Sequence, residues 1–284
     1  MSSRTGEKGG QAPEELRRLA LLVEYEGTAY HGFQSQSNAA SVQATLEEAL
    51  YSLTGEQRRI QGAGRTDAGV HAEGQVVAFD TWAAYDPGVF VQALNHYLPE
   101  DVSVKEAREV SLDFDPRRWA VSREYRYQIL NSATSSPLLR RHAHLVRKPL
   151  DTVAMREAAR FLEGERDYGP FSGPLDIGRR GTRRRMFHCL VNRSADLVTL
   201  DMVADGFLPQ QVRRTAGALV AVGLGRLDLQ GFVALAECGV QGVAHTVLPA
   251  KGLSLKNVSY PDSLFALGER GEALENTILE AVAK

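Results

Sequence analysis

The alternation of strand-like and helix-like segments is the feature that most constrains how this chain of 284 residues can fold. Aliphatic or alternating runs predict strands, and apolar residues three or four positions apart predict helices. In the first part of the chain these segments occur in the order 19–26 (strand), 42–53 (helix), 75–79 (strand), 87–97 (helix) and 102–109 (strand). This β-α-β-α-β order predicts a ferredoxin-like α+β half.

The rest of the chain alternates in a similar way. Strands are predicted at 123–130, 185–193, 197–203 and 253–260, and helices at 150–162, 210–222 and 232–238. Two halves of one class predict a pseudo-repeat, although no repeat is visible residue by residue. The predicted organisation is a disordered leader (1–18), an N-terminal half (19–112), a C-terminal half (113–262) and a helical tail (263–284).

The composition limits the class of protein. A hydrophobic fraction of 43% and a charged fraction of 24% are typical of an ordinary globular chain. The longest apolar runs, such as 19–23, are too short to span a bilayer, and the polar segment 1–13 lacks the apolar core of a signal peptide. Two cysteines, Cys189 and Cys238, are too few for a disulfide framework. We therefore expect a cytoplasmic protein with no membrane partner.

The charge distribution indicates a polyanionic partner although the net charge is −2. Residues 117–185 hold 16 lysines and arginines against seven acidic residues, a local net charge of +9. A basic middle segment in an otherwise acidic chain is the asymmetry expected of a nucleic-acid-binding face.

A glycine-rich loop carries the first candidate catalytic residue. Four glycines fall within residues 62–74, and Asp67 stands among them, two residues after Arg65. Because glycine permits positive φ and close approach, such a loop can hold a carboxylate in a geometry suited to a nucleophile or general base. The alternative is a turn with a local ion pair. A nearby cation, either Arg65 or a distant arginine, would keep Asp67 ionised.

The basic segment supplies two further candidates. Tyr125 and Tyr127 alternate with arginines in a predicted strand, which indicates either a stacking platform for bases or tyrosines packed in the core. The run 179–185, which includes Arg183 and Arg184, holds five arginines in seven residues. It is expected either to grip a phosphate backbone or to form a solvated loop.

One more arginine lies where a charge is unusual. Arg213 belongs to a predicted helix that is otherwise apolar, so it is either exposed or the partner of a buried carboxylate. The seven histidines show no metal-ligand spacing, and no Ser-His-Asp arrangement stands out. We therefore expect no metal site.

A set of motifs spread from about Leu19 to Tyr260 resembles the TruA family of tRNA pseudouridine synthases. The most specific is the loop around Asp67, which is similar to that family's signature. The motifs are Gly64-Arg65-Thr66-Asp67-Ala68-Gly69-Val70-His71-Ala72, Tyr25-Glu26-Gly27, Ser41-Val42-Gln43, Phe114-x-Pro116-Arg117, Tyr125-Arg126-Tyr127, Phe207-Leu208, Val212-Arg213 and Gly252-Leu253.

The resemblance implies a fold and a reaction. The fold would be the pseudouridine synthase fold, two pseudo-symmetric ferredoxin-like halves that share a central, mainly antiparallel sheet with flanking helices. The activity would be cofactor-independent isomerisation of uridine to pseudouridine at positions 38–40 of the tRNA anticodon arm. Asp67 would be the nucleophile on a flipped uridine, attacking either the ribose C1′ or the uracil C6. Flipping a base out of a stem costs a few kcal/mol, which phosphate contacts can offset.

The resemblance also implies roles for other residues. Tyr125 would stack on the target base and assist deprotonation at C5, and Leu253 would line the uracil pocket. Arg65 would support the space vacated by the flipped nucleotide, and Arg213 would pair with the catalytic aspartate. The family's members are homodimers that bind one tRNA across both subunits.

Departures from the family's pattern leave some questions open. Gln211 stands where the family usually has methionine, so the sequence alone does not decide whether Arg213 pairs with Asp67. A non-catalytic tRNA-binding module is a second hypothesis. A third is a glycoside hydrolase with an aspartate nucleophile, for which Glu73 is the second carboxylate near the loop.

Overall fold

A computed structural model describes residues 15–174, 181–261 and 264–265 of the chain. Within these residues the strands and helices alternate largely as predicted. The helices are α1 (Val42–Thr54), α2 (Pro87–Tyr97), α3 (Thr152–Phe161), α4 (Gln211–Gly223) and α5 (Leu229–Glu237). The strands are β1 (Arg17–Tyr25), β2 (Gln61–Gly62), β3 (His71–Thr81), β4 (Val102–Val110), β5 (Ser122–Leu130), β6 (His144–Leu145), β7 (Gly164–Asp167), β8 (Arg183–Ser194), β9 (Leu197–Ala204) and β10 (Leu253–Ser259).

These strands form one ten-stranded sheet. Its main path runs β4-β1-β3-β10-β5-β9-β8-β7, while β2 pairs with β3 and β6 pairs with β5. The β10–β3 and β5–β6 pairs are parallel, and the other pairs are antiparallel. The predicted α+β fold with a central, mainly antiparallel sheet is therefore confirmed.

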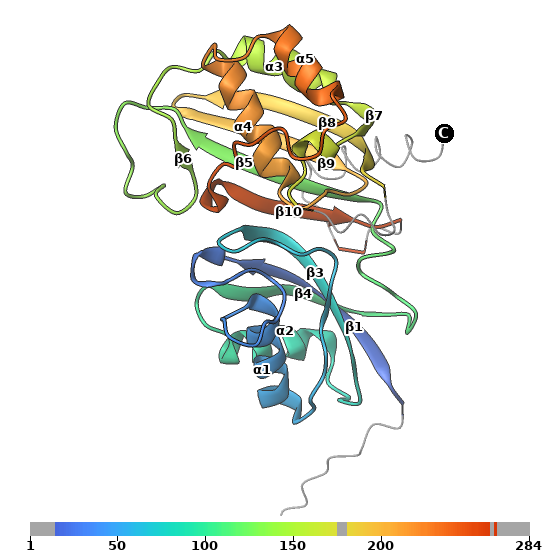
Figure 1. Cartoon of the computed structure of the whole chain (residues 1–284). Coiled ribbons are helices and arrows are strands. Elements are labelled where there is room, and N and C mark those ends of the chain that lie inside the picture. Colours follow the sequence, from blue (N-terminus) through green and yellow to red (C-terminus); the bar gives the residue numbers. More distant parts are fainter. Residues whose placement is uncertain (1–14, 175–180, 262–263, 266–284) are drawn as a thin grey trace, which may run out of the picture.

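The two halves of the sheet have the same strand order. In the N-terminal half β4 pairs with β1, β1 with β3, and β3 with β2. In the C-terminal half β10 pairs with β5, β5 with β9, and β9 with β8. In each half the fourth strand therefore lies beside the first, which is the ferredoxin-like arrangement. Figure 1 shows α1 and α2 with the N-terminal strands and α3, α4 and α5 with the C-terminal strands.

The halves are joined at β3 and β10. The parallel pairing covers two residue pairs, Ser254 with His71 and Leu255 with Ala72. A single hydrophobic cluster continues across this junction and contains buried side chains of both halves. The sheet and the core therefore join the two halves at β3 and β10 (Figure 1), and the Asp67 loop leads directly into the start of β3.

Local sequence signals explain where the helices begin. The side chain of Ser41 accepts a hydrogen bond from the backbone N–H of Ala44 at 3.3 Å and caps α1. Asp151 caps α3 by accepting from the backbone N–H groups of Val153 and Ala154 at 2.9 and 3.0 Å. Both caps satisfy donors that have no partner within the helix.

Short strands account for most of the differences from the prediction. β2 and β6 have two residues each, and β7 (Gly164–Asp167) consists of glycine and charged residues on the sheet edge. None of them carries the apolar alternation from which strands are predicted. β8 begins at Arg183, two residues before the predicted strand 185–193, so the alternative of a solvated loop is wrong for Arg183 and Arg184. Pairing with β7 makes this part of the arginine run extended.

Some predicted segments cannot be compared with the structure. β1 begins at Arg17, inside the segment predicted as leader, but residues 1–14 lie outside the described residues. The same holds for Arg179 and Arg180, and for the predicted helical tail apart from residues 264–265.

Candidate active site

Backbone hydrogen bonds hold the Asp67 loop between β2 and β3 on both sides of the aspartate. The backbone N–H of Phe33 donates to the carbonyl oxygen of Thr66 at 3.2 Å, and that of Gly69 donates to the carbonyl oxygen of Tyr30 at 3.2 Å. The side chain of Asp67 is 39% exposed. The loop is therefore anchored while its carboxylate stays accessible.

Two glycines make this close approach possible. A Cβ added at Gly27 would lie 2.0 Å from the carbonyl oxygen of Val70, a distance that no side chain can tolerate. Gly32 has φ of +101° and lies against the backbone of Thr66, so it combines close approach with a left-handed conformation. The segment 27–33 can thus pack directly on the loop.

The carboxylate of Asp67 is paired with an arginine from the other half of the molecule. Arg213, in the first turn of α4, donates from Nη1 to Oδ2 of Asp67 at 3.0 Å. Its Nε donates to the carbonyl oxygen of Leu248 at 2.8 Å, and its side chain is only 16% exposed. Of the two candidate partners, the distant Arg213 pairs with Asp67, whereas the neighbouring Arg65 does not.

The polar Gln211 does not displace Arg213. Its side chain is buried, and its Oε1 accepts a hydrogen bond from the backbone N–H of Leu208 at 2.8 Å. Gln211 therefore closes the turn that leads into α4. Arg213 follows in the first turn of the same helix and reaches Asp67. The question that the sequence left open is answered by this geometry.

Seven of the predicted site residues meet in one cleft. The cleft has a volume of about 580 Å³ and is lined by residues of both halves. The predicted residues that line it are Arg65, Asp67, Tyr125, Arg183, Arg184, Arg213 and Leu253. Residues that lie far apart in the sequence, such as Arg65 and Leu253, thus converge on a single concave surface, which is the usual form of a ligand site.

Tyr125 forms part of the wall of this cleft. Its side chain is 9% exposed, and its ring contacts Phe207 in a T-shaped arrangement with the centroids 5.1 Å apart. Burial raises the pKa of the Tyr125 hydroxyl well above its ordinary value, so the phenol stays protonated at neutral pH. The structure therefore presents a fixed, neutral aromatic ring to the cleft.

Tyr127 has a different place. It is fully buried, and its hydroxyl donates to the carbonyl oxygen of Pro249 at 2.8 Å. The interpretation of Tyr125 and Tyr127 as a two-residue stacking platform is therefore wrong for Tyr127, which belongs to the core. Both side chains lie on one face of β5, but the segment before β10 covers the ring of Tyr127, which lies against Gly252 and bonds to Pro249.

Arg123 supports the cleft and was not identified from the sequence. It is largely buried, and its guanidinium donates to the carbonyl oxygens of Ala63, Arg117, Ala120 and Asp205. Burial lowers its pKa. The arginine ties the start of the Asp67 loop to the C-terminal half, and only the fold brings these four carbonyl groups together.

The arginines of β8 lie at the edge of the cleft. Arg183 donates from Nε to Oε1 of Glu165 at 2.9 Å, with both side chains largely exposed. Arg184 donates from Nη1 to the carbonyl oxygen of Gly181 at 2.9 Å. An exposed pair of this kind contributes little to stability, so Arg183 can exchange its partner for a phosphate.

Asp205 is a second carboxylate in the cleft, to which the sequence pattern assigned no separate role. Its Oδ1 accepts from the backbone N–H of Arg185 at 3.1 Å, and burial raises its pKa. Glu73, the candidate for a second carboxylate beside the loop, instead pairs with Lys256 outside the cleft.

No group of three or more potential metal ligands occurs in the described part of the chain. Among the helices that the structure describes, none has the length and apolar character needed to cross a membrane.

Comparison with known proteins gives one consistent family. The family sequence model described as tRNA pseudouridine synthase matches residues 21–117 and 158–261. A relative from Roseiflexus castenholzii named tRNA pseudouridine synthase A is 42% identical, over 94% of this chain and 97% of its own length. Relatives of the same name from Geotalea daltonii and a Roseiflexus species are 40% and 44% identical, over 86% and 87% of this chain and 100% and 92% of theirs.

Proposed function

The chain belongs to the tRNA pseudouridine synthases, isomerases that convert uridine in tRNA into pseudouridine, and we propose that it acts on the anticodon arm with Asp67 as its nucleophile. The target uridines in this proposal are those at positions 38–40. The substrate class follows from the family, whereas the arm and the nucleophile are inferred from the motif around Asp67 and from its surroundings.

The proposed reaction conserves all atoms of the nucleotide. A carboxylate oxygen of Asp67 attacks either the ribose C1′ or the uracil C6 of a flipped uridine. The bond between N1 and C1′ breaks, the base rotates, and a bond forms between C5 and C1′. The bond between the Asp67 oxygen and the nucleotide breaks, which restores the free carboxylate. The proton on C5 is lost and N1 gains a proton, so the product is an isomer of the substrate.

The chemistry needs an ionised and oriented carboxylate. The guanidinium of Arg213, 3.0 Å from Asp67, fixes the direction of the carboxylate. Tyr125 offers its ring for stacking on the flipped base, and Leu253 lines the same cleft as an apolar wall for uracil. Arg65 is proposed to occupy or support the space that the flipped nucleotide vacates in the RNA.

Binding of tRNA is proposed to use the basic edge of the cleft. Arg183 and Arg184 line it and are assigned to phosphate contacts, which supply most of the affinity of proteins for nucleic acids. The family resemblance adds two proposals, a homodimer that binds one tRNA across both subunits and a cytoplasmic location. Light scattering of the purified protein tests the first, and a monomer at micromolar concentration would contradict it.

The observation that carries the proposal is the ion pair between Asp67 and Arg213 inside a cleft that also contains Tyr125. A solvated surface aspartate would need neither the buried arginine nor the glycine contacts behind its loop. The arrangement supplies one positioned carboxylate, one positioned cation and one aromatic wall, which are the groups that the proposed reaction uses.

The test uses the full chain and tRNA transcripts labelled with tritium at C5 of uridine. The expected result is release of tritium into water, and pseudouridine mapped at positions 38–40 of the product. Pseudouridine at other positions would contradict the assignment to the anticodon arm. A protein that binds tRNA but releases no tritium from any transcript would support the non-catalytic binding module instead.

A further inference from the structure

A second cavity adjoins the cleft on the side of the N-terminal half. It has a volume of about 270 Å³ and is lined by residues of the segments 33–34, 59–65 and 115–117. Gly64, Arg65 and Arg117 line both this cavity and the cleft that contains Asp67. The two spaces therefore meet at these three residues.

The wall between the two cavities is cationic. Within residues 15–174, 181–261 and 264–265, neither Arg65 nor Arg117 has a hydrogen bond or an ion pair from its guanidinium. The backbone of Arg117 is nevertheless fixed, because its N–H donates to Oδ1 of Asp115 at 2.9 Å and its carbonyl oxygen accepts from Arg123 at 2.6 Å. A held backbone with an unpaired guanidinium suits capture of a phosphate.

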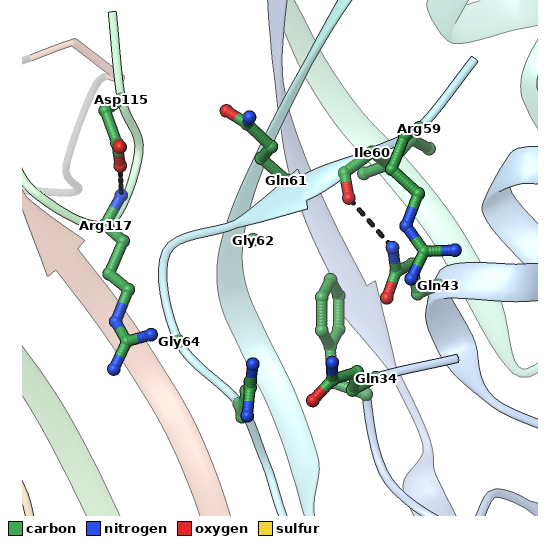
Figure 2. A pocket seen from close by; sticks show the side chains of 11 residues that line it. Gln34, Gln43, Arg59, Ile60, Gln61, Gly62, Gly64, Asp115 and Arg117 are labelled. Carbon is green, nitrogen blue, oxygen red and sulfur yellow. Dashed lines mark hydrogen bonds between the residues drawn. The ribbon is translucent and has the colours of Figure 1, made fainter. Parts of the chain in front are cut away.

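The passage between the cavities is open at Gly64. A Cβ added at Gly64 would have the hydroxyl of Tyr125 as its nearest neighbour, 3.9 Å away. In Figure 2 the side chain of Arg117 extends toward Gly64, with Arg59 on the opposite side of the cavity and Gln34 at its lower edge. The absence of a side chain at Gly64 thus leaves room for close approach of a polynucleotide backbone.

The inner part of the cavity offers groups that can bind a base. The ring of Phe33 lies against Gly62, where an added Cβ would come within 2.4 Å of it. The amide of Gln43 is fully used, since it donates to Glu47 and to the carbonyl oxygen of Ile60 at 2.8 and 2.9 Å. The Gln34 amide has no hydrogen-bond partner among the described residues, so it is available for a base edge.

We propose that this cavity is a second nucleotide subsite, which holds the nucleotide next to the target uridine in the same RNA strand. The phosphate between the two nucleotides passes Gly64 and is bound by Arg117, with Arg65 on the other wall. The Gln34 amide contacts the edge of the neighbouring base. This inference rests on the proposed function, because it places the target uridine in the cleft beside Asp67.

Arg117 and Arg118 provide a matched pair of variants. Arg118 is the adjacent residue, its side chain is 78% exposed and paired with Asp115, and it lines neither cavity. R117Q is expected to raise KM for tRNA about tenfold, with kcat within about threefold of the wild type. The slope of log affinity for tRNA against log salt concentration is expected to become shallower by about one. R118Q is expected to change KM less than about twofold. Equal effects of the two variants would overturn the proposal.

A chemically modified substrate locates the contact. Transcripts that carry one neutral methylphosphonate, placed either 5′ or 3′ to the target uridine, remove the charge of one linking phosphate. At one of the two positions the wild-type protein is expected to lose about tenfold in kcat/KM, and R117Q is expected to lose nothing further. Additive losses at both positions would overturn the assignment of Arg117 to the linking phosphate.

The two proposals fail in different ways. If the wild-type protein forms no pseudouridine in any tRNA, the proposed function fails. If it forms pseudouridine and R117Q behaves like R118Q, only the second subsite fails.

Q34A with Q36A as its control extends the test to the base, because Gln36 lies nearby but outside the cavity. A larger rise in KM for Q34A is expected, and equal values would remove Gln34 from the subsite.

Discussion

The guanidinium of Arg213 meets the carboxylate of Asp67 at 3.0 Å, although 146 positions separate the two residues in the chain. The pair connects the first turn of α4 in the C-terminal half to the glycine-rich loop of the N-terminal half. Because the second donor of Arg213 is held by the carbonyl oxygen of Leu248, the guanidinium cannot rotate away without losing that bond. The relative position of the two halves thus sets the direction of the carboxylate.

Replacing Asp67 by asparagine removes the proposed nucleophile and keeps the size of the side chain. Tritium release by D67N is expected to fall to less than about 0.1% of the wild-type rate, with affinity for tRNA within about threefold. Glu73→Gln is the control, because Glu73 lies outside the cleft and pairs with Lys256. It is expected to keep wild-type activity. Near-normal tritium release by D67N would remove Asp67 from the reaction.

Replacing Arg213 tests the orientation of the carboxylate. R213Q is expected to reduce kcat about a hundredfold, because an aspartate without its buried partner is displaced from the reactive geometry. R213K retains the charge but cannot bind Asp67 and Leu248 from one planar group, so an intermediate rate is expected. Both rates are measured at saturating tRNA. If R213Q and R213K have the same kcat as the wild type, the pair is only structural.

Two variants of Tyr125 separate stacking from proton transfer. Y125L removes the ring and is expected to lower kcat/KM about 10- to 100-fold, the range of one base–aromatic contact. Y125F keeps the ring and is expected to lose less than about tenfold, because the raised pKa of Tyr125 makes its hydroxyl a poor proton acceptor at neutral pH. Equal inactivity of Y125F and Y125L would show instead that the hydroxyl takes part in the loss of the C5 proton.

Arg123 is expected to matter for stability as well as for the cleft. R123M leaves four carbonyl groups without their donor, and we expect the free energy of unfolding to fall by about 2–3 kcal/mol. Urea denaturation followed by fluorescence measures this change. R118M is the matched control on an exposed neighbour and is expected to stay within about 0.5 kcal/mol of the wild type. A similar small change for R123M would contradict the role assigned to it.

The stability of the protein is expected to fall with pH below about 6.5 because of His71. Nδ1 of His71 accepts from the backbone N–H of Gly27 at 3.0 Å, while Nε2 lies 2.8 Å from the carbonyl oxygen of Arg141, so the neutral ring is fully bonded. Burial lowers its pKa in the folded state, with Glu26 and His142 also facing the ring. At a pH between the lowered pKa of His71 in the folded protein and its ordinary pKa in the unfolded chain, the unfolded chain binds the proton more readily. Protonation therefore favours unfolding.

Urea denaturation at pH 7.5 and pH 5.5 measures this effect. The wild type is expected to lose more unfolding free energy between the two values than His71→Gln, which has no titrating ring at this position. His144, whose pKa burial also lowers, contributes in both proteins and cancels in the comparison. An equal loss in the two proteins would show that protonation of His71 does not affect folding.

The sequence alone determined the elements and the family. Helical spacing and the caps Ser41 and Asp151 gave the helices to within a few residues, because these signals act over one or two turns. The motif around Asp67, together with the ordered motifs before and after it, indicated the tRNA pseudouridine synthases, and the excess of arginines pointed to a polyanion. Short edge strands such as β7 were missed. Pairing with β8 makes β7 extended, whereas the composition of β7 gives no strand signal.

Only the tertiary structure decided which residues face one another. Tyr125 and Tyr127 are equivalent by alternation, yet one lines the cleft and the other is fully buried, because the segment before β10 packs on Tyr127 through Pro249 and Gly252. The choice of Arg213 over Arg65 as partner of Asp67, and the gathering of four carbonyl groups around Arg123, depend on contacts between the two halves. Such contacts follow from the packing of the whole sheet and leave no local signal in the sequence.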